Sequence, residues 1–223
     1  MNYLAHAYLS FGNPEILTGN LISDFVKGKK KFDYPEGIQK GITLHRAIDT
    51  FTDSHEATRE AKVFFREAYG LYAGALVDVA YDHFLANDPG EFPGDRAADH
   101  GRERPADGQA DSGRRRPTDG LAAFAEKTYE QLAPFAPLFP ERFARMFPYM
   151  RSQNWLYNYR FKEGIFSSFA GLARRAAYMP SSEAACRIFE AGYPGLEACY
   201  KAFFPKLKEF ASAALTELLA NSG

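Results

Sequence analysis

The stretch PEGIQKGITLHRAIDTFT, residues 35–52, carries apolar and chemically useful side chains at intervals of three and four residues. A proline opens it, as is common at the start of a helix. The recurring positions are Ile38, Ile42, His45, Ile48, Asp49 and Thr52. This spacing predicts a helix on which His45 and Asp49 lie about one turn apart on the same face.

Helical periodicity dominates the rest of the chain as well. We expect helices at Ile16–Val26, Glu56–Tyr69, Leu71–Leu85, Leu121–Leu132, Glu141–Arg160, Gly164–Ala177, Ser182–Ala191 and Gly195–Leu219. Alternating patterns typical of strands are scarce. A length of 223 residues suits one domain. The sequence therefore predicts an all-α fold with a single domain over residues 1–223.

Composition and charge narrow the class of protein. Hydrophobic residues make up 46% of the chain and aromatic residues 15%, which favours a packed globule over a disordered chain. The formal net charge of −1 gives no reason to expect nucleic acid or a membrane as partner. The N-terminus MNYLAHAYLS lacks the basic lead and apolar run of a signal peptide, and no stretch of 18 apolar residues occurs. Together with only two cysteines, expected to be thiols, this predicts a cytoplasmic protein.

The segment Gly94–Asp119 differs from everything around it. It reads GDRAADHGRERPADGQADSGRRRPTD and contains no large apolar residue. Such a segment buries too little surface to offset its ordering entropy, so we expect a solvated, mobile insertion between two helices. The alternative is a charged tether for a partner. We discount His100, which lies inside it, as a ligand.

The remaining histidines and several aspartates gather in the first 85 residues. They are His6, His45, His55 and His83 with Asp24, Asp49, Asp53, Asp78 and Asp82. Imidazole and carboxylate together suit Mn²⁺, Fe²⁺, Zn²⁺ or Mg²⁺. Asp78 and Asp82 are four apart on a segment that is apolar all round, where carboxylates are costly unless they are paired or bind a metal. Spacing alone leaves simple alternatives open, namely ion pairs for Asp49 and helix caps for Asp24 and Asp53.

Several blocks resemble the signature blocks of acyl carrier protein phosphodiesterases. They are MNYLAHAYLS, GNLISDFVKG, GITLHRAIDTFTDSH, VDVAYDHFLA, SQNWLYNYRFKEGI, FAGLARRAAY and YKAFFPKLKEF. The resemblance implies a divergent HD-type helical phosphohydrolase with Mn²⁺, or another divalent metal such as Mg²⁺ or Fe²⁺, as cofactor. It implies removal of the 4′-phosphopantetheine arm from holo-acyl carrier protein by metal-assisted hydrolysis. The products implied by this resemblance are apo-carrier and 4′-phosphopantetheine.

The resemblance also implies site residues. His6, Asp24, His45 and Asp78 are the expected metal ligands. Asp49 and Asp82 match the same blocks in supporting or alternative ligand positions. The expected catalytic residues, which orient the attacking water or move a proton, are Asp24, Asp49 and Asp82.

Basic residues support an acidic protein substrate. Lys27, Lys29 and Lys30 directly follow Asp24, and acyl carrier proteins are strongly acidic, so these lysines are expected to steer the carrier. Arg46 and Arg160 are expected to contact substrate, with Arg174 and Arg175 as further candidates. We interpret the aromatic residues of 155–159 as core rather than as a groove for pantetheine. Two other functions stay open: hydrolysis of a nucleotide or another small phosphoester, and carrier binding without catalysis.

Overall fold

The helix predicted from residues 35–52 forms the long helix α3 (Glu36–Ser54) in the computed structural model, which describes residues 2–93, 119–176 and 178–220. Its apolar face is buried through Ile38, Ile42 and Ile48. At its end, His55 caps the next helix α4 (Glu56–Tyr69), because its Nδ1 accepts a hydrogen bond of 3.2 Å from the Ala57 N–H. This agrees with the interpretation of His55 as a residue at a helix start.

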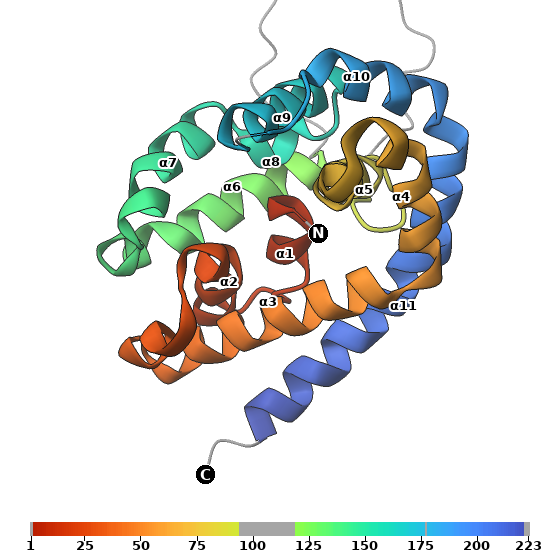
Figure 1. Cartoon of the computed structure of the whole chain (residues 1–223). Helices are drawn as coiled ribbons and strands as arrows, with labels where there is room; N and C mark the ends of the chain where they lie inside the picture. The colour runs from red at the N-terminus through yellow and green to blue at the C-terminus, as the bar shows by residue number, and fades with distance from the viewer. Residues whose placement is uncertain (1, 94–118, 177, 221–223) are drawn as a thin grey trace, which may run out of the picture.

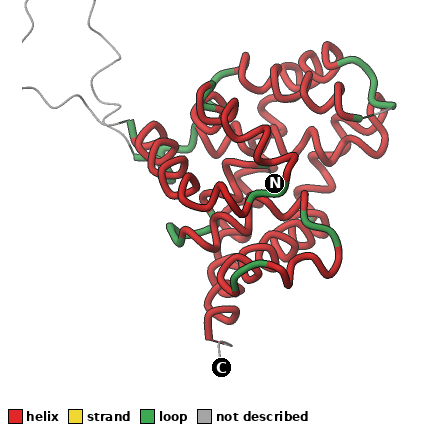
Figure 2. The backbone as a smooth tube through the Cα atoms, turned by 90° about the vertical axis from the view of Figure 1, so that its left-hand side faces the viewer, coloured by secondary structure: helices red, strands yellow, loops and turns green. Residues whose placement is uncertain are grey.

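The described residues are almost entirely helical and include no strand (Figure 2). The all-α prediction is therefore confirmed. The other α-helices are α1 (Tyr3–Tyr8), α2 (Pro14–Ile22), α5 (Ala73–Ala86), α6 (Gly120–Leu132), α7 (Glu141–Ser152), α8 (Trp155–Asn158), α9 (Lys162–Arg175), α10 (Ser182–Ala191) and α11 (Tyr193–Ala220). Short 3₁₀ turns are η1 (Ser23–Phe25), η2 (Gly28–Asp33), η3 (Gly70–Tyr72) and η5 (Ala133–Leu138).

Two predicted helices were wrong in extent, and one observed helix was not predicted. The helix expected at Ile16–Val26 ends at Ile22 and continues as the 3₁₀ turn η1. The single helix expected at Glu141–Arg160 is two helices, α7 and α8, separated where Asn154 takes a left-handed backbone conformation with φ of 47°. Helix α1 was not predicted, since six residues carry too little periodicity to recognise.

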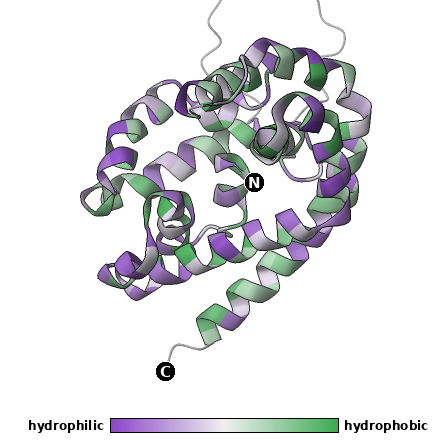
Figure 3. Ribbon diagram, viewed as in Figure 1, coloured by the Kyte–Doolittle hydropathy of each residue, from purple (hydrophilic) through white to green (hydrophobic). Residues whose placement is uncertain are grey.

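Helix α1 lies near the middle of the molecule, with the longer helices arranged around it (Figure 1). The long helix α11 packs against α3, α4 and α5. Aromatic rings fill this contact: Tyr81 of α5 stacks on Phe203 with ring centroids 5.1 Å apart, and Tyr200 stacks on Phe204. The long helices carry hydrophobic and hydrophilic positions side by side along their ribbons, as expected when one face of each is buried (Figure 3).

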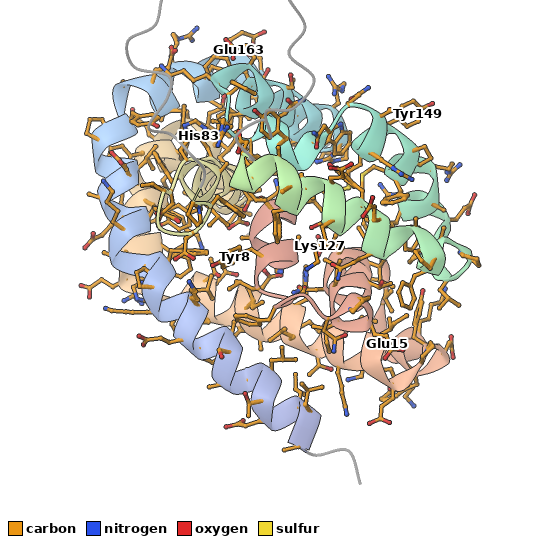
Figure 4. All side chains as sticks on the ribbon, turned by 180° about the vertical axis from the view of Figure 1, so that it is seen from behind. Tyr8, Glu15, His83, Lys127, Tyr149 and Glu163 are labelled. Carbon is orange, nitrogen blue, oxygen red and sulfur yellow. The ribbon has the colours of Figure 1, made fainter. Side chains whose placement is uncertain are left out.

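The far end of α1 is tied to α11. Tyr8 donates a hydrogen bond to Glu91, and Nζ of Lys208 lies 2.5 Å from the same carboxylate. Tyr8 is seen beside α11 when the molecule is viewed from behind (Figure 4). The position of α1 is thus fixed at its C-terminal end by contacts with residues distant in sequence.

Helices α2 and α3 approach so closely that their backbones touch at two glycines. A Cβ at Gly19 would lie 2.1 Å from the backbone oxygen of Ile38 and 2.8 Å from Cα of Gly41. A Cβ at Gly41 would lie 2.3 Å from the backbone oxygen of Ile16. Neither contact involves a side chain that can move aside, so both positions require glycine.

We expect Gly19→Ala to destabilise the protein by about 2 kcal/mol, because the added methyl group forces α2 and α3 apart. Urea denaturation followed by circular dichroism measures the change. The control is Gly74→Ala on α5, where a Cβ meets only the end of the Lys62 side chain. That change should be neutral or stabilising, since alanine is the better helix former. Equal stability of the two variants would contradict the close backbone contact.

The predicted insertion Gly94–Asp119 lies outside the described residues except for Asp119. Asp119 is the N-cap of α6, and its Oδ1 accepts hydrogen bonds from the N–H groups of Leu121 and Ala122. It therefore belongs to the helical fold. Among the described residues, no helix has the length and apolar character needed to cross a membrane.

Candidate metal centre

Two histidines from different helices stack face to face. His6 lies on α1 and His45 on α3, with ring centroids 4.0 Å apart and ring planes inclined by 17°. Both side chains are buried. Burial of two imidazoles is costly unless their ring nitrogens find partners. The contacts of those nitrogens therefore indicate which ring nitrogen carries a proton and which can bind a ligand.

Asn20 of α2, which is fully buried, engages both rings at the same nitrogen. Its Oδ1 lies 2.7 Å from Nδ1 of His6, and its backbone oxygen lies 2.7 Å from Nδ1 of His45. Its Nδ2 donates to the backbone oxygen of His6 and to Oγ of Ser10, which assigns Oδ1 as the acceptor. Nδ1 of each ring must then carry a proton. In the neutral ring this leaves Nε2 with a free lone pair.

Asn20 was missed from the sequence. The available signal was an amide inside the apolar segment 16–26, since a buried amide needs partners. Nothing in the spacing indicates which residues those partners are.

Carboxylates face the Nε2 side of the pair. Oδ1 of Asp49 lies 3.2 Å from Nε2 of His6, and Oδ2 of the same side chain lies 3.0 Å from Nε2 of His45. Oδ1 of Asp24 is 3.3 Å from Nε2 of His45. The side chains of Asp49 and Asp24 are 40% and 71% exposed, so the cluster has a buried imidazole side and an open carboxylate side.

The two rings have opposite pKa shifts. Burial lowers the pKa of His6 to about 4, and the neighbouring His45 acts in the same direction. Burial also disfavours the charged form of His45, but Asp24 and Asp49 outweigh it and raise its pKa to about 9. The hydrogen bond to His45 lowers the pKa of Asp24. Burial raises the pKa of Asp49, but both histidines outweigh it and hold the value well below its usual range.

The cluster has the donor set of a divalent metal site. His6, His45 and Asp49 each offer one ligand atom, and these atoms lie within 4.8 Å of one another. Nε2 of His6 is buried without a hydrogen-bond partner of acceptable geometry among the described residues. Imidazoles oriented through Nδ1, together with a carboxylate, are typical of transition-metal sites. The residues present therefore fit a divalent cation at this point, where the carboxylates stabilise positive charge.

Comparison with known proteins places the chain in a family. The family model described as "Acyl carrier protein phosphodiesterase" matches residues 1–104 and 112–207. The chain belongs to this family. It is similar to the acyl carrier protein phosphodiesterase of Salmonella paratyphi A, with 30% identity over 207 residues, which are 93% of this chain and 95% of that protein. The relative of the same name from Escherichia coli O6:H1 is 30% identical over 212 residues, 95% of this chain and 98% of its own length. No solved structure matches.

Asp82, one of the aspartates in the family blocks, belongs to α5, and its side chain contacts the N-terminus of α1. Its fully buried carboxylate accepts hydrogen bonds from the backbone N–H groups of Asn2, Leu4 and Ala5, at 3.3, 2.7 and 3.3 Å. Burial raises its pKa to about 7, while these N–H groups act in the opposite direction. Asp82 thus holds the helix that carries His6, which is a positioning role. Its predicted part in proton transfer stays a prediction.

Asp78, predicted as a ligand, lies outside the His6–His45–Asp49 group and lines a cavity of about 570 Å³. Asp24 lines the same cavity while it contacts His45. We call this space the cluster cavity. It is lined by Asn2, Tyr3, Asp24, Phe25, Ala75, Asp78, Arg142, Met146, Trp155, Leu172 and Arg175. The structure brings Asp49 against the two histidines, and Asp24 links the cluster to the cavity. Ligation of a metal by Asp78 stays a prediction.

The predicted basic residues follow η1. Lys27, Lys29 and Lys30 are exposed on and beside η2, directly after Asp24. Arg46 of α3 donates a hydrogen bond of 3.1 Å to the backbone oxygen of Val26, which ties the start of this turn to α3. The sequence predicted the charge here, and the fold leaves it facing outward.

Arg160 has a partner inside the protein. Its guanidinium pairs with both carboxylate oxygens of Asp119, and so joins the segment after α8 to the start of α6. Contact of Arg160 with substrate stays a prediction.

His83, in the same family block as Asp82, donates from Nδ1 to the backbone oxygen of Tyr159 and accepts at Nε2 from Tyr193. It joins α5 to α8 and α11, away from the candidate ligands.

Proposed function

We propose that this protein hydrolyses holo-acyl carrier protein to apo-carrier and 4′-phosphopantetheine in the cytoplasm. Membership of the acyl carrier protein phosphodiesterase family supports the substrate. The observation that carries the chemistry is the stacked pair of histidines, oriented by one asparagine and facing a shared carboxylate. This arrangement lies beside a cavity large enough for a small-molecule group.

We assign the metal to His6, His45 and Asp49, with Mn²⁺ as the first candidate and Mg²⁺ or Fe²⁺ as alternatives. When bound there, a divalent ion would supply positive charge for the phosphoryl oxygens and would lower the pKa of a water molecule. Asn20 holds both imidazoles in the tautomer that presents Nε2. Asp24, exposed on the open side, is placed to orient water or accept its proton.

Recognition of the carrier rests on charge. Lys27, Lys29 and Lys30 closely follow Asp24 in the sequence and are exposed, so they would attract an acidic protein at long range. Such steering weakens as salt screens the charges. An acidic protein therefore fits this rim better than a small phosphoester, which needs no extended basic surface.

The test is to incubate holo-carrier with the protein and Mn²⁺, and to follow the mass of the carrier. We expect loss of the phosphopantetheine arm, no loss after treatment with a chelator, and recovery when Mn²⁺ is added back. Cleavage of nucleotides with the carrier left intact would favour a phosphohydrolase of small substrates. Binding of carrier without any mass change, across Mn²⁺, Mg²⁺ and Fe²⁺, would instead indicate a non-catalytic binding module.

A further inference from the structure

A second cavity lies beside the cluster cavity, along α9. Its volume is about 470 Å³, and we call it the α9 cavity. Both cavities are lined by Asn2, Tyr3, Trp155 and Arg175, so the two spaces adjoin at these side chains. A ligand long enough to pass these four side chains would reach from Asp24 to α9.

The lining of the α9 cavity combines aromatic and hydrogen-bonding groups. Trp155 and Phe161 provide aromatic surface, while Gln153 and Ser167 provide amide and hydroxyl groups. The interpretation of the aromatic residues of 155–159 as core holds for Tyr159, which is buried, but Trp155 is partly exposed and lines both cavities. A pantetheine arm has apolar methyl groups, two amides and a thiol, and such a chain needs both kinds of contact.

Cationic side chains line both cavities. Arg142 lines the cluster cavity, Arg175 lines both cavities and Arg174 lines the α9 cavity. Glu163 is the acidic residue of the α9 lining. Arginine binds phosphate well because its planar guanidinium donates paired hydrogen bonds. Arg175 is the one of these three at the junction.

We propose, resting on the proposed function, that the α9 cavity receives the pantetheine part of the carrier's arm and that Arg175 contacts its phosphate. The reacting phosphodiester then lies in the cluster cavity beside Asp24, while the arm extends past Trp155 towards Gly171. Recognition of the arm is thereby assigned to residues of α8 and α9. Attraction of the carrier protein is assigned separately to Lys27, Lys29 and Lys30.

Gly171 allows the cavity to be filled with little disturbance of the fold. A Cβ at this position meets only the ends of the Arg175 and Arg174 side chains, at 3.7 and 3.8 Å. Gly171→Phe should therefore occupy the cavity while α9 stays helical. The matched control is Gly74→Phe on α5, where a Cβ meets only the end of Lys62 and which lines neither cavity.

Binding of free 4′-phosphopantetheine and of pantetheine can be followed without turnover. Trp155 is the single tryptophan of the chain, so its fluorescence reports on this location, and titration calorimetry gives an independent reading. We expect saturable binding to the natural protein and to Gly74→Phe, and a dissociation constant raised about tenfold or more in Gly171→Phe. Arg175→Gln should weaken 4′-phosphopantetheine about tenfold and leave pantetheine nearly unchanged.

Equal affinity of Gly171→Phe and the natural protein would overturn the proposal, as would absence of binding by both methods. If Gly171→Phe does not fold, Ser167→Phe, at an exposed position of the same cavity, takes its place. The mass of the carrier separates this inference from the proposed function. Cleavage with unchanged kcat/KM in the filled variant refutes the arm site alone, whereas arm binding without carrier cleavage refutes the function alone.

Discussion

Replacing His45 with alanine is expected to lower metal-dependent hydrolysis of holo-carrier by at least about 100-fold. Loss of a residue that only orients a metal ligand can cost that much, and this substitution removes a proposed ligand itself. His45 contacts Asn20, Asp24 and Asp49, and its ring stacks on His6, so its loss removes contacts with four parts of the cluster. Alanine is the best helix former, and α3 should keep its helical content. The measurements are the rate of carrier mass loss, the bound metal per protein and the far-ultraviolet circular dichroism.

His55→Asn is the matched control for His45→Ala. His55 is a histidine at the end of the same helix, it lies outside the candidate ligand group, and asparagine preserves its capping of α4. Its activity should stay close to that of the natural protein. Full activity of His45→Ala with normal metal content would refute the proposed centre.

Asp82→Ala is expected to lower the free energy of unfolding by about 3 kcal/mol, since three backbone N–H groups would lose a buried acceptor. The loss should extend to metal binding, because the helix that these groups begin carries His6. Urea denaturation measures the first effect and metal titration the second. A variant with normal stability would show that the carboxylate does not hold α1 in place.

Two further variants serve as controls for Asp82→Ala. Asp82→Asn keeps one acceptor oxygen and should be less destabilised than Asp82→Ala. Asp53→Ala removes a carboxylate that is 73% exposed and paired with Lys62, and such surface pairs contribute at most about 1 kcal/mol. If Asp53→Ala matched Asp82→Ala, burial would not be the cause of the larger effect.

Local patterns predicted the parts of the site that depend on one helix. The interval of four residues between His45 and Asp49 places both on one face of α3, and their side chains do meet. Most helices were predicted for the same reason, since their apolar periodicity is local. The ends of Glu56–Tyr69 and Ser182–Ala191 agree with the structure because a cap or turn residue marks each boundary.

Contacts between distant segments were not predictable in this way. Asp78 and Asp82 share the spacing of His45 and Asp49, yet Asp82 turns to the start of α1 and Asp78 to the cluster cavity. Helix α1 is short, and the acceptor of its first N–H groups lies nearly 80 residues away. Asn20 gave no spacing signal, because its partners His6 and His45 come from two other helices.

The contact between Gly19 and Gly41 fixes the distance between α2 and α3 beside the candidate metal centre. Asn20 directly follows one of these glycines, and His45 lies one turn after the other. Backbone atoms in direct contact cannot shorten their separation, and no side chain fills the gap to vary it. The distance between Asn20 and the imidazole of His45 is therefore fixed by van der Waals contact between the two main chains. Substitutions elsewhere in the core should change it little.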